Sequence, residues 1–381
     1  MAANSFDSSR VEECKVTRAG GSKLTATVIG AGLAGTHSIN ALLASDRYEL
    51  IGVADVSEAA RARVREKTGG AVKTYATSDE LLSASPADVV CISTYPETHL
   101  PITRDAVARA PLRGLLVEKP LGDTTPSGRA ILELVKAAKL PMVVPHWLVA
   151  LRAPLQIASD VRNGRIGNLR VVEIECTNWD LHNAGTHFIQ YFLTLVSPSP
   201  VQHVLMAADI STRTFRDRMQ VETEAVTFAR TASGVRLIIH TGDDIPVSRK
   251  GACIFMRITG ERGFIEFDAY QNMYTVVTSG HDRVDVNVEP FAEKSHQRHL
   301  EHLAHQIESG VRDYTIPDQS LAALEVVEAA YQSRRCAKLV SLPLDPEALS
   351  EAPKWDPGAL YAGSGGGRDG RQFLGRYRER V

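Results

Sequence analysis

Three glycines close to the amino end of the chain have the clearest chemical meaning. They form a G-x-G-x-x-G pattern directly after a short apolar run. Glycines at this spacing permit a tight turn and let a pyrophosphate approach the backbone, while the amino end of the following helix offers N–H groups to the anion. The pattern predicts a dinucleotide-binding loop with these members: Gly30, Ala31, Gly32, Leu33, Ala34 and Gly35.

An acidic residue follows the loop at the distance expected for a contact with the ribose of the cofactor. Asp55 lies about twenty residues past the last glycine, at the end of the next apolar run. A carboxylate there accepts hydrogen bonds from both ribose hydroxyls and repels a 2′-phosphate. The two residues after it supply no cation, and we interpret Arg61, Arg63 and Arg65 as a solvated helix face. We therefore expect NAD in preference to NADP.

Short β-rich runs alternate with helical stretches over the first part of the chain. The predicted strands are residues 25–29, 49–54, 89–92, 115–117 and 141–144. The predicted helices are residues 34–45, 57–68, 78–84, 99–110 and 126–138. Such alternation is typical of right-handed βαβ units on a parallel sheet. We expect an α/β Rossmann domain with a doubly wound parallel sheet over residues 23–147, after a flexible leader over residues 1–22.

The pattern changes after this domain. Helical segments over residues 151–163 and 185–195 come first, and helices over 294–309 and 318–336 come last. The strands predicted between them are residues 222–230, 234–240, 252–259, 263–267, 274–278 and 284–288. Short turns between consecutive strands indicate a mainly antiparallel sheet. We expect an α+β substrate and oligomerisation domain over residues 148–345 and a partly flexible extension over residues 346–381.

Two of the later strands predict a contact between copies of the chain. Residues 235–239 and 253–256 are nearly continuous apolar runs, which is the pattern of a strand covered on both faces. The helices of the domain can cover one face. A second copy is expected to cover the other, because a large apolar sheet face in water is an aggregation hazard. The sequence thus predicts a homo-oligomer formed through the C-terminal sheet.

The composition excludes several classes of partner. The chain has 44% hydrophobic and 23% charged residues, and its net charge of -2 offers no basic field to nucleic acid. No apolar run approaches the roughly 20 residues of a membrane span, and the opening residues lack a secretory signal. The five cysteines are odd in number and far apart, which argues against disulfides and a zinc site. We expect a cytoplasmic protein with a small-molecule substrate and no metal.

Two further segments, together with the glycine loop, resemble a known family. Residues 94–99 read Thr-Tyr-Pro-Glu-Thr-His, and residues 118–120 read Glu-Lys-Pro. The chain thereby resembles the glucose-fructose oxidoreductase / inositol dehydrogenase / MocA (Gfo/Idh/MocA) family from about residue 24 to 342. The Glu-Lys-Pro triplet is much more specific to this family than the glycine loop. The resemblance implies a Rossmann domain joined to a domain with a large open sheet. It also implies substrates that are sugars, cyclitols or similar polyols.

The resemblance implies catalytic residues as well. Members generally use the lysine of Glu-Lys-Pro with an aspartate and a histidine four residues apart in the second domain. Lys119 matches the lysine and His187 the histidine, but Asn183 stands where the aspartate is usual. A neutral histidine can accept a hydroxyl proton as hydride leaves carbon, and a lysine can stabilise the developing alkoxide. Asn183 can position a substrate hydroxyl but cannot take its proton.

Further contacts are expected around these residues. From the resemblance, the cofactor also contacts Thr94, Pro96, His99, Glu118 and Lys119. The expected substrate contacts are Lys119, Trp147, Trp179, Asp180, Asn183 and His187. Asp180 can supply the missing carboxylate or be a solvated loop residue. Each tryptophan can stack on a sugar ring or belong to the core.

Four histidines recur at every third position near the carboxyl end of the chain: His296, His299, His302 and His305. A spacing of three drifts steadily around a helix, and the apolar residues between them already mark the buried stripe. We interpret them as a surface feature rather than as a metal site.

These features predict a NAD(P)-dependent dehydrogenase that acts on CH-OH groups. It would transfer hydride between nicotinamide and a secondary alcohol or ketone of a sugar, cyclitol or related polyol. Two alternatives stay open. One is an enzyme with transient internal redox that eliminates or hydrolyses a substituent without net NADH. The other is a non-catalytic NAD-sensing regulator, which the resemblance allows through the galactose-pathway repressor of yeasts.

Overall fold

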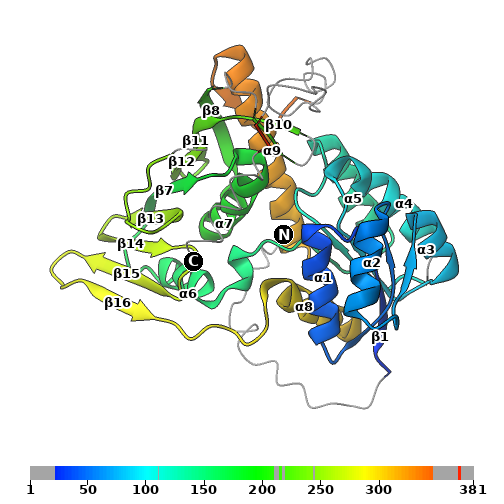
Figure 1. Ribbon diagram of the computed structural model, residues 1–381. Coiled ribbons are helices and arrows are strands. Elements are labelled where there is room, and N and C mark those ends of the chain that lie inside the picture. Colours follow the sequence, from blue (N-terminus) through cyan, green and yellow to red (C-terminus); the bar gives the residue numbers. More distant parts are fainter. Residues whose placement is uncertain are drawn as a thin grey trace. The chain divides into compact units, whose positions relative to one another are not determined.

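The computed structural model describes residues 22–109, 111–209, 214–216, 219–242, 245–345 and 368–369. The chain divides into two compact units (Figure 1). Among the described residues, those up to 150 and those over 292–321 form the first unit, and those over 151–291 and from 322 onward form the second. The leader and most of the C-terminal extension that the sequence predicts lie outside the described residues.

The first unit contains a six-stranded sheet in the order β3-β2-β1-β4-β5-β6. Its strands are β1 (Leu24–Ile29), β2 (Tyr48–Ala54), β3 (Lys73–Tyr75), β4 (Val89–Ile92), β5 (Gly114–Val117) and β6 (Met142–Val143). Every neighbouring pair is parallel, so the doubly wound Rossmann sheet is confirmed. The sequence did not predict β3, which is short and has no fully buried residue.

Helices cover both faces of this sheet. One buried cluster joins the sheet to α1 (Leu33–Ala44), α2 (Glu58–Lys67) and α8 (Ser295–Ser309). The other joins it to α3 (Ser78–Ala84), α4 (His99–Arg109) and α5 (Thr125–Ala137).

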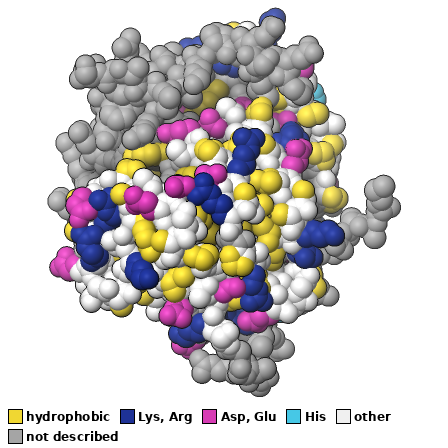
Figure 2. Space-filling model, turned by 90° about the vertical axis from the view of Figure 1, so that its right-hand side faces the viewer, with side chains coloured by type: hydrophobic (Ala, Val, Ile, Leu, Met, Phe, Trp, Pro, Cys, Tyr) yellow, Lys and Arg dark blue, Asp and Glu magenta, His cyan; other side chains and the backbone are white. Residues whose placement is uncertain are grey.

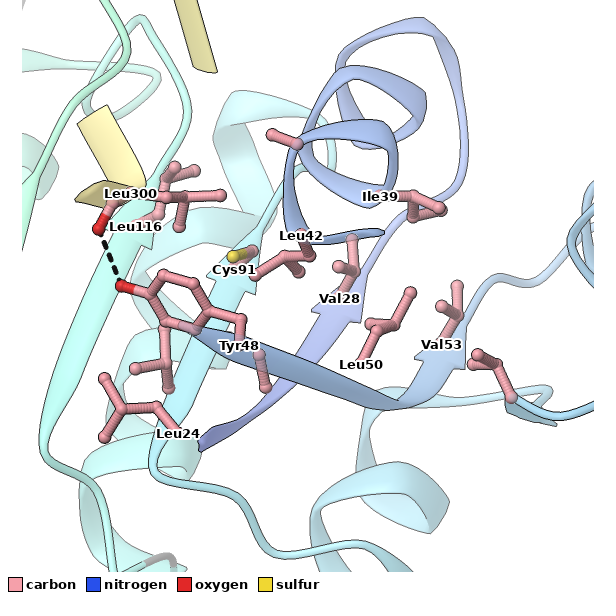
Figure 3. Packing of buried hydrophobic residues seen from close by; sticks show 14 of the residues in the cluster. Leu24, Val28, Ile39, Leu42, Tyr48, Leu50, Val53, Cys91, Leu116 and Leu300 are labelled. Carbon is pink, nitrogen blue, oxygen red and sulfur yellow. Dashed lines mark hydrogen bonds between the residues drawn. The ribbon is translucent and has the colours of Figure 1, made fainter. Parts of the chain in front are cut away.

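The packing of α8 explains the division of the chain. Figure 3 shows the first cluster, in which the Tyr48 hydroxyl donates to the Leu300 carbonyl oxygen over 2.7 Å. Leu300 and Leu303 of α8 are fully buried in it. This helix therefore belongs to the Rossmann unit, whereas the sequence placed residues 294–309 in the second domain. A helix with one apolar stripe packs on whichever sheet face is open to it, and the stripe alone does not say which.

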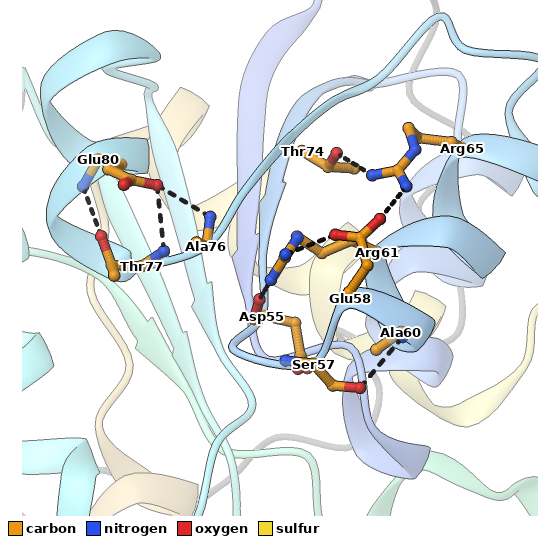
Figure 4. Close-up of polar contacts among 10 residues, drawn as sticks. All are labelled: Asp55, Ser57, Glu58, Ala60, Arg61, Arg65, Thr74, Ala76, Thr77 and Glu80. Atoms are coloured by element: carbon orange, nitrogen blue, oxygen red, sulfur yellow. Dashed lines mark hydrogen bonds and ion pairs between the residues drawn. The ribbon is translucent and has the colours of Figure 1, made fainter.

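Local signals fix several helix ends in the first unit. Thr77 and Glu80 form a capping box at the start of α3, and the Ser57 hydroxyl accepts from Ala60 N–H at the start of α2 (Figure 4). Such caps satisfy N–H groups that have no partner within the helix. The predicted boundaries of α1 to α5 accordingly differ from the observed ones by no more than one residue.

The second unit contains a nine-stranded sheet in the order β16-β15-β14-β13-β7-β12-β11-β8-β17. Its strands are β7 (Leu169–Thr177), β8 (Val201–Asp209), β11 (Glu224–Thr231), β12 (Arg236–Gly242), β13 (Ile254–Gly260), β14 (Gly263–Asp268), β15 (Met273–Thr278), β16 (Val284–Asn287) and β17 (Val340–Ser341). Only β7 and β12 pair in parallel within this sheet. The mainly antiparallel α+β domain is confirmed, although the sequence did not predict β7 and β8.

The remaining strands form a separate three-stranded sheet in the order β10-β9-β18. These strands are β9 (Thr214–Arg216), β10 (Met219–Val221) and β18 (Arg368–Asp369). The helices of the second unit are α6 (Arg152–Arg162), α7 (Thr186–Val196) and the later part of α9 (Thr315–Cys336). The helix α7 packs against β7, and α9 contacts β8 where Met206 N–H donates to the Ser333 hydroxyl.

The large sheet has one buried face and one face that is partly apolar and exposed. Along β12, Leu237 and Ile239 are buried while Ile238 between them is only half-buried. On the opposite face, Leu205 keeps 44% and Val226 keeps 42% of its surface exposed. Within this chain, the strand over residues 235–239 is thus fully covered on one face only.

The surface of the first unit carries charges of both signs. Figure 2 shows Lys and Arg side chains interspersed with Asp and Glu side chains on one face of the molecule. Pairs such as Lys136 with Asp318 and Arg109 with Asp79 lie on this unit. In the described part of the chain, no helix is long and apolar enough to span a membrane.

Candidate functional site

The glycine loop lies between β1 and α1, and its three glycines meet different requirements. Gly30 has φ = +94°, and a Cβ there would overlap the Ser93 carbonyl group. A Cβ on Gly35 would overlap the Gly30 carbonyl group, so the helix could not pack as closely on the loop. A Cβ on Gly32 would meet nothing within 4 Å. The space in front of Gly32 is therefore open to a ligand.

The amino end of α1 fits the pyrophosphate of a dinucleotide. Gly32 is the N-cap residue of α1, and in the described chain no side chain caps this end of the helix. Its first turn also contains no acidic residue. Uncapped N–H groups and the positive end of the helix dipole favour an anion at this position. The loop residues expected from the sequence thus surround an open site with anion-binding character.

Asp55, at the end of β2, is tied directly to the glycine loop. One carboxylate oxygen accepts from Ala31 N–H over 2.6 Å, and the other accepts from Ser57 N–H over 2.8 Å. Each carboxylate oxygen has a further lone pair, so the group can still accept from ribose hydroxyls. The structure brings Asp55 and the glycine loop together as the sequence predicts.

The arginines after Asp55 are less solvated than the sequence suggested. Arg61 donates to the Asp55 carbonyl oxygen over 2.5 Å and pairs with Glu58 (Figure 4). Arg65 also pairs with Glu58 and donates to the Thr74 hydroxyl over 2.9 Å. Only Arg63 is fully exposed. The interpretation as a solvated face was therefore wrong for Arg61, whose side chain is 16% exposed, whereas the Arg65 side chain is still 42% exposed.

The segment after β4 is held by hydrogen bonds within itself. Thr94 is half-buried, and its hydroxyl accepts from the Thr98 hydroxyl over 2.7 Å. Pro96 begins the short helix η2 (Pro96–Thr98). These contacts give the segment a defined shape next to the glycine loop, since Ser93 lies against Gly30.

The side chain of His99 stabilises this segment through contacts with backbone carbonyl groups. The ring is fully buried, with its nitrogens 3.1 Å from the Thr94 carbonyl oxygen and 3.3 Å from the Leu121 carbonyl oxygen. Burial lowers the pKa of His99, so the ring is neutral and donates its single N–H to one of the two carbonyls. The sequence placed His99 among the cofactor contacts. In the structure, its ring joins the loop at Thr94 to the loop at Leu121.

Glu118 and Lys119 follow β5, and the carboxylate of Glu118 is buried. Its Oε1 lies 2.8 Å from His296 Nε2, and its Oε2 accepts from Lys119 N–H over 3.3 Å. Burial by itself raises the pKa of Glu118, but the neighbouring His296 and Lys119 outweigh it and hold this pKa below its usual value. Lys119 is half-buried and precedes a cis peptide bond to Pro120. The contact between His296 on α8 and Glu118 after β5 thus holds the backbone next to Lys119 in place.

The four histidines of α8 lie in different environments. His296 contacts Glu118, and its ring centroid lies 5.2 Å from that of His37 on α1. His299 is buried, and its Nε2 lies 3.0 Å from the His146 carbonyl oxygen. His305 is exposed. The interpretation as a surface feature was therefore wrong for His296 and His299, because a spacing of three carries these residues onto the buried side of the helix.

The second unit carries Asn183 in a π-helical turn, η4 (Leu181–Gly185), that continues into α7. Gly185 N–H donates to the Asp180 carbonyl oxygen over 3.2 Å, which is the i→i+5 bond of such a turn. Asp180 caps the turn by accepting from Asn183 N–H over 2.7 Å. Asn183 Nδ2 lies 3.1 Å from each oxygen of the same carboxylate. Asp180 is therefore a buried partner of Asn183 and not a solvated loop residue.

The other expected substrate residues lie on both units. His187 is in the first turn of α7 and is 8% exposed. Trp179 is half-buried and forms a backbone bridge with Gly242. Trp147 and Lys119 belong to the first unit, and both are half-buried.

Sequence reasoning missed Glu222, which lies next to the turn that carries Asn183. Its side chain is buried and accepts from Leu181 N–H over 2.5 Å and from the Tyr331 hydroxyl over 2.9 Å. These residues are 41 and 109 positions from Glu222 along the chain. A pattern within a short stretch of sequence cannot predict a contact between residues so far apart in the chain. The only available signal was an acidic residue at the start of the strand predicted over residues 222–230.

Residues 24–146 match the sequence model of a family described as "Oxidoreductase family, NAD-binding Rossmann fold" (GFO_IDH_MocA). The rhizopine catabolism protein MocA of Rhizobium meliloti is 32% identical over 155 residues. That match covers 40% of this chain and 46% of the relative, so it spans about half of the relative's length.

Two solved structures resemble the chain over most of its length. GenD2 from gentamicin A biosynthesis, in complex with NAD, is 19% identical with a TM-score of 0.70 and covers 86% of this chain and 99% of that one. Myo-inositol 2-dehydrogenase from Lactobacillus plantarum is 14% identical with a TM-score of 0.69 and covers 84% and 99%. At these identities the likeness concerns the fold.

The fold, the loop geometry and these comparisons agree. The first unit is an NAD-binding Rossmann domain. Residues 24–146 match the Gfo/Idh/MocA oxidoreductase family, as the sequence motifs predicted.

Proposed function

We propose that this protein is an NAD-dependent dehydrogenase that acts on CH-OH groups. It transfers hydride between nicotinamide and a secondary alcohol, or the matching ketone, of a sugar, cyclitol or related polyol. The observation that carries the proposal is the Asp180–Asn183 pair, with Nδ2 of Asn183 at 3.1 Å from both carboxylate oxygens. A carboxylate is thus present in the turn although Asn183 replaces the usual aspartate.

His187 is the acid/base of the proposed reaction, and Asn183 orients the substrate. Because Asn183 Nδ2 donates to Asp180, its Oδ1 is the atom that accepts from a substrate hydroxyl. Asp180 is 2% exposed, so it acts through Asn183 rather than on the substrate. His187 takes the hydroxyl proton during oxidation and returns it during reduction. The cofactor, when bound, supplies the hydride acceptor or donor.

Lys119 is the electrostatic partner in this proposal. Its ammonium group stabilises the negative charge that develops on the substrate oxygen. The buried Glu118–His296 pair holds the backbone at Lys119 in place. Trp147 and Trp179 are proposed to line the substrate site, where either ring can stack on a sugar face.

NAD is proposed to contact the glycine loop, Asp55, Thr94 and Pro96. The open space at Gly32 and the uncapped end of α1 support the pyrophosphate position. The carboxylate of Asp55 supports the ribose position and a preference for NAD over NADP.

We also propose a cytoplasmic homo-oligomer that forms through the outer face of the large sheet. Leu205 and Val226 support this interface because they leave apolar surface exposed on neighbouring strands. Sedimentation of the wild-type protein and of a Leu205→Glu, Val226→Glu variant tests the interface. A smaller particle is expected for the variant.

The proposed activity is tested by a screen for NADH formation with sugars, sugar acids and inositols. Wild type, Lys119→Ala and His187→Ala are compared, with NAD and with NADP. NADH formed by wild type and lost in both variants supports the assigned roles. NAD binding with no turnover on any substrate favours the regulator, and turnover of a substrate without net NADH favours the internal redox enzyme.

A further inference from the structure

A buried carboxylate lies against the turn η4 in the second unit. Glu222 is 1% exposed, and it follows β10 directly. Its Oε1 accepts from Leu181 N–H over 2.5 Å and from the Thr241 hydroxyl over 3.1 Å. Its Oε2 accepts from the Tyr331 hydroxyl over 2.9 Å. One side chain therefore joins η4 to β12 and α9.

The backbone brings these segments unusually close together. Gly242 ends β12 with φ = +152°, and a Cβ on it would overlap the backbone at Thr223 and Glu224. The chain after Glu222 thus passes directly over the end of β12. This close approach places the Glu222 side chain beside Thr241, with Leu181 N–H within reach of the same oxygen.

Two carboxylates hold the same turn from different sides. The Asp180 carboxylate accepts from both the backbone N–H and the side-chain amide of Asn183. Glu222 holds the neighbouring Leu181. The two groups interact: burial first, and then the charge of Asp180, raise the pKa of Glu222 to about 7. Near neutral pH Glu222 therefore gains or loses a proton.

We infer that Glu222 is a positioning residue for the turn that carries Asn183, and that its protonation state controls how tightly this turn is held. When ionised, Glu222 accepts three hydrogen bonds with a full negative charge, and charge-assisted bonds of this kind are stronger than neutral ones. When protonated, it donates to the Tyr331 oxygen and holds Leu181 N–H less strongly. The consequence for turnover rests on the proposed function, whereas the titration of Glu222 does not.

The groups that face Glu222 limit what else can titrate there. The titratable groups around it include Asp180 before η4, whose charge raises its pKa, Tyr331 on α9, which donates to it, and the buried His182 within η4. The group from β12 is the uncharged Thr241 hydroxyl. Burial, followed by the charge of Glu222, raises the pKa of Tyr331 well above its usual value, so Tyr331 stays protonated near neutral pH.

The direction of the effect on stability follows from the raised pKa. An unfolded glutamate has a pKa of about 4.3. A folded-state pKa above that value contributes stability that is fully present below pH of about 4.3 and is lost as the pH rises through about 7. Glu222→Gln keeps the shape and an acceptor for Leu181 N–H but cannot ionise. It should therefore lack this pH dependence.

The first test is the melting temperature of the full-length protein at several pH values between 5 and 8.5. Wild type is compared with Glu222→Gln and with Glu224→Gln, a matched variant of an exposed glutamate two positions further on. The melting temperature of Glu222→Gln should rise relative to wild type as the pH increases, while Glu224→Gln follows wild type. A constant difference across the range would overturn the inference. This measurement needs no substrate, so it stands even if the proposed function fails.

A second variant keeps the test decisive if Glu222→Gln does not fold. Tyr331→Phe removes one hydrogen bond that lowers the pKa of Glu222. The pH-dependent part of the melting curve should then move to higher pH. An unchanged curve for Tyr331→Phe would contradict the assignment.

The second readout applies once a substrate has been found. Glu222→Gln should lower kcat by about tenfold, the equivalent of one charge-assisted hydrogen bond, and should remove an inflection near neutral pH from the profile of kcat/KM. The dissociation constant for NAD should stay unchanged, because the glycine loop and Asp55 lie in the first unit. A wild-type kcat and pH profile in Glu222→Gln would show that Glu222 has no positioning role.

Discussion

The glycine loop and the turn that carries Asn183 place polar groups by two different means. The loop depends on the backbone of six consecutive residues, with open space at Gly32 and an uncapped helix end directly after it. The turn depends on side chains from distant segments, with Glu222 holding Leu181 and Asp180 holding Asn183. A site that is formed by the backbone depends on residues that are consecutive in the sequence. A buried side-chain network depends on how strands and helices pack together. The variants below test whether substitutions in the two regions have correspondingly different effects on stability, cofactor binding and turnover.

The largest effect is expected for His187. Replacing it with Gln removes the proposed acid/base, and general acid–base groups contribute about 10²- to 10⁴-fold to a rate. Steady-state kinetics with the substrate from the screen should show a loss of kcat of this size, with the NAD dissociation constant unchanged. His281→Gln is the control because His281 is exposed in a loop. A small loss shared by both variants would remove His187 from the chemistry.

The next largest effect should separate two glycines of the loop. Gly35→Ala puts a Cβ into the Gly30 carbonyl group and should lower the free energy of unfolding by about 3 kcal/mol. Gly32→Ala meets no atom within 4 Å, so it should fold normally while weakening NAD binding by about tenfold. Denaturant unfolding and NAD titration measure the two effects. Equal destabilisation by both substitutions would contradict the geometry of the loop.

Asp55→Asn sharpens the account of cofactor choice. The substitution keeps the shape of the side chain but removes its charge, so NAD should bind about tenfold more weakly through loss of charge-assisted hydrogen bonds to ribose. NADP should bind better relative to NAD, because repulsion of the 2′-phosphate is removed and Arg61 lies next to the Asp55 carbonyl. Titrations with both cofactors measure the ratio. An unchanged ratio would mean that Asp55 does not face the ribose.

The smallest effect is expected for the contact between Glu118 and His296, which is a buried side-chain pair in the first unit. His296→Ala leaves the buried Glu118 carboxylate without this partner and should cost about 1–2 kcal/mol of unfolding free energy. Because the pKa of Glu118 is held below its usual value, its contribution is present above pH of about 4.3 and is lost as the pH falls. The difference from wild type should therefore shrink in acid. His305→Ala, on the exposed side of the same helix, should have little effect at any pH.

The sequence predicted the backbone devices well because each one is local. The glycine spacing, Asp55 and the alternation of strands and helices are all visible within short windows. β7 was missed although Val172, Ile174 and Cys176 alternate with polar neighbours and are buried. The position of α8 was missed because its apolar stripe fits either unit.

The site in the second unit was predicted only in part. The resemblance to the family identified Asn183 and His187, but the π-helical form of the turn depends on its i→i+5 bond and on the Asp180 cap. Glu222 could not be found, since its partners Leu181, Thr241 and Tyr331 come from three separate segments. Only the folded chain brings them together.

The most direct test of the central claim follows a deuterium atom. The protein is incubated with NAD and with polyols that carry deuterium on the carbinol carbons, and the nicotinamide is then examined by mass spectrometry. We predict that deuterium appears in the nicotinamide with wild type and not with His187→Gln, although both bind NAD equally. NAD binding by wild type with no transfer of deuterium from any polyol would contradict the assignment of this protein as a hydride-transfer enzyme.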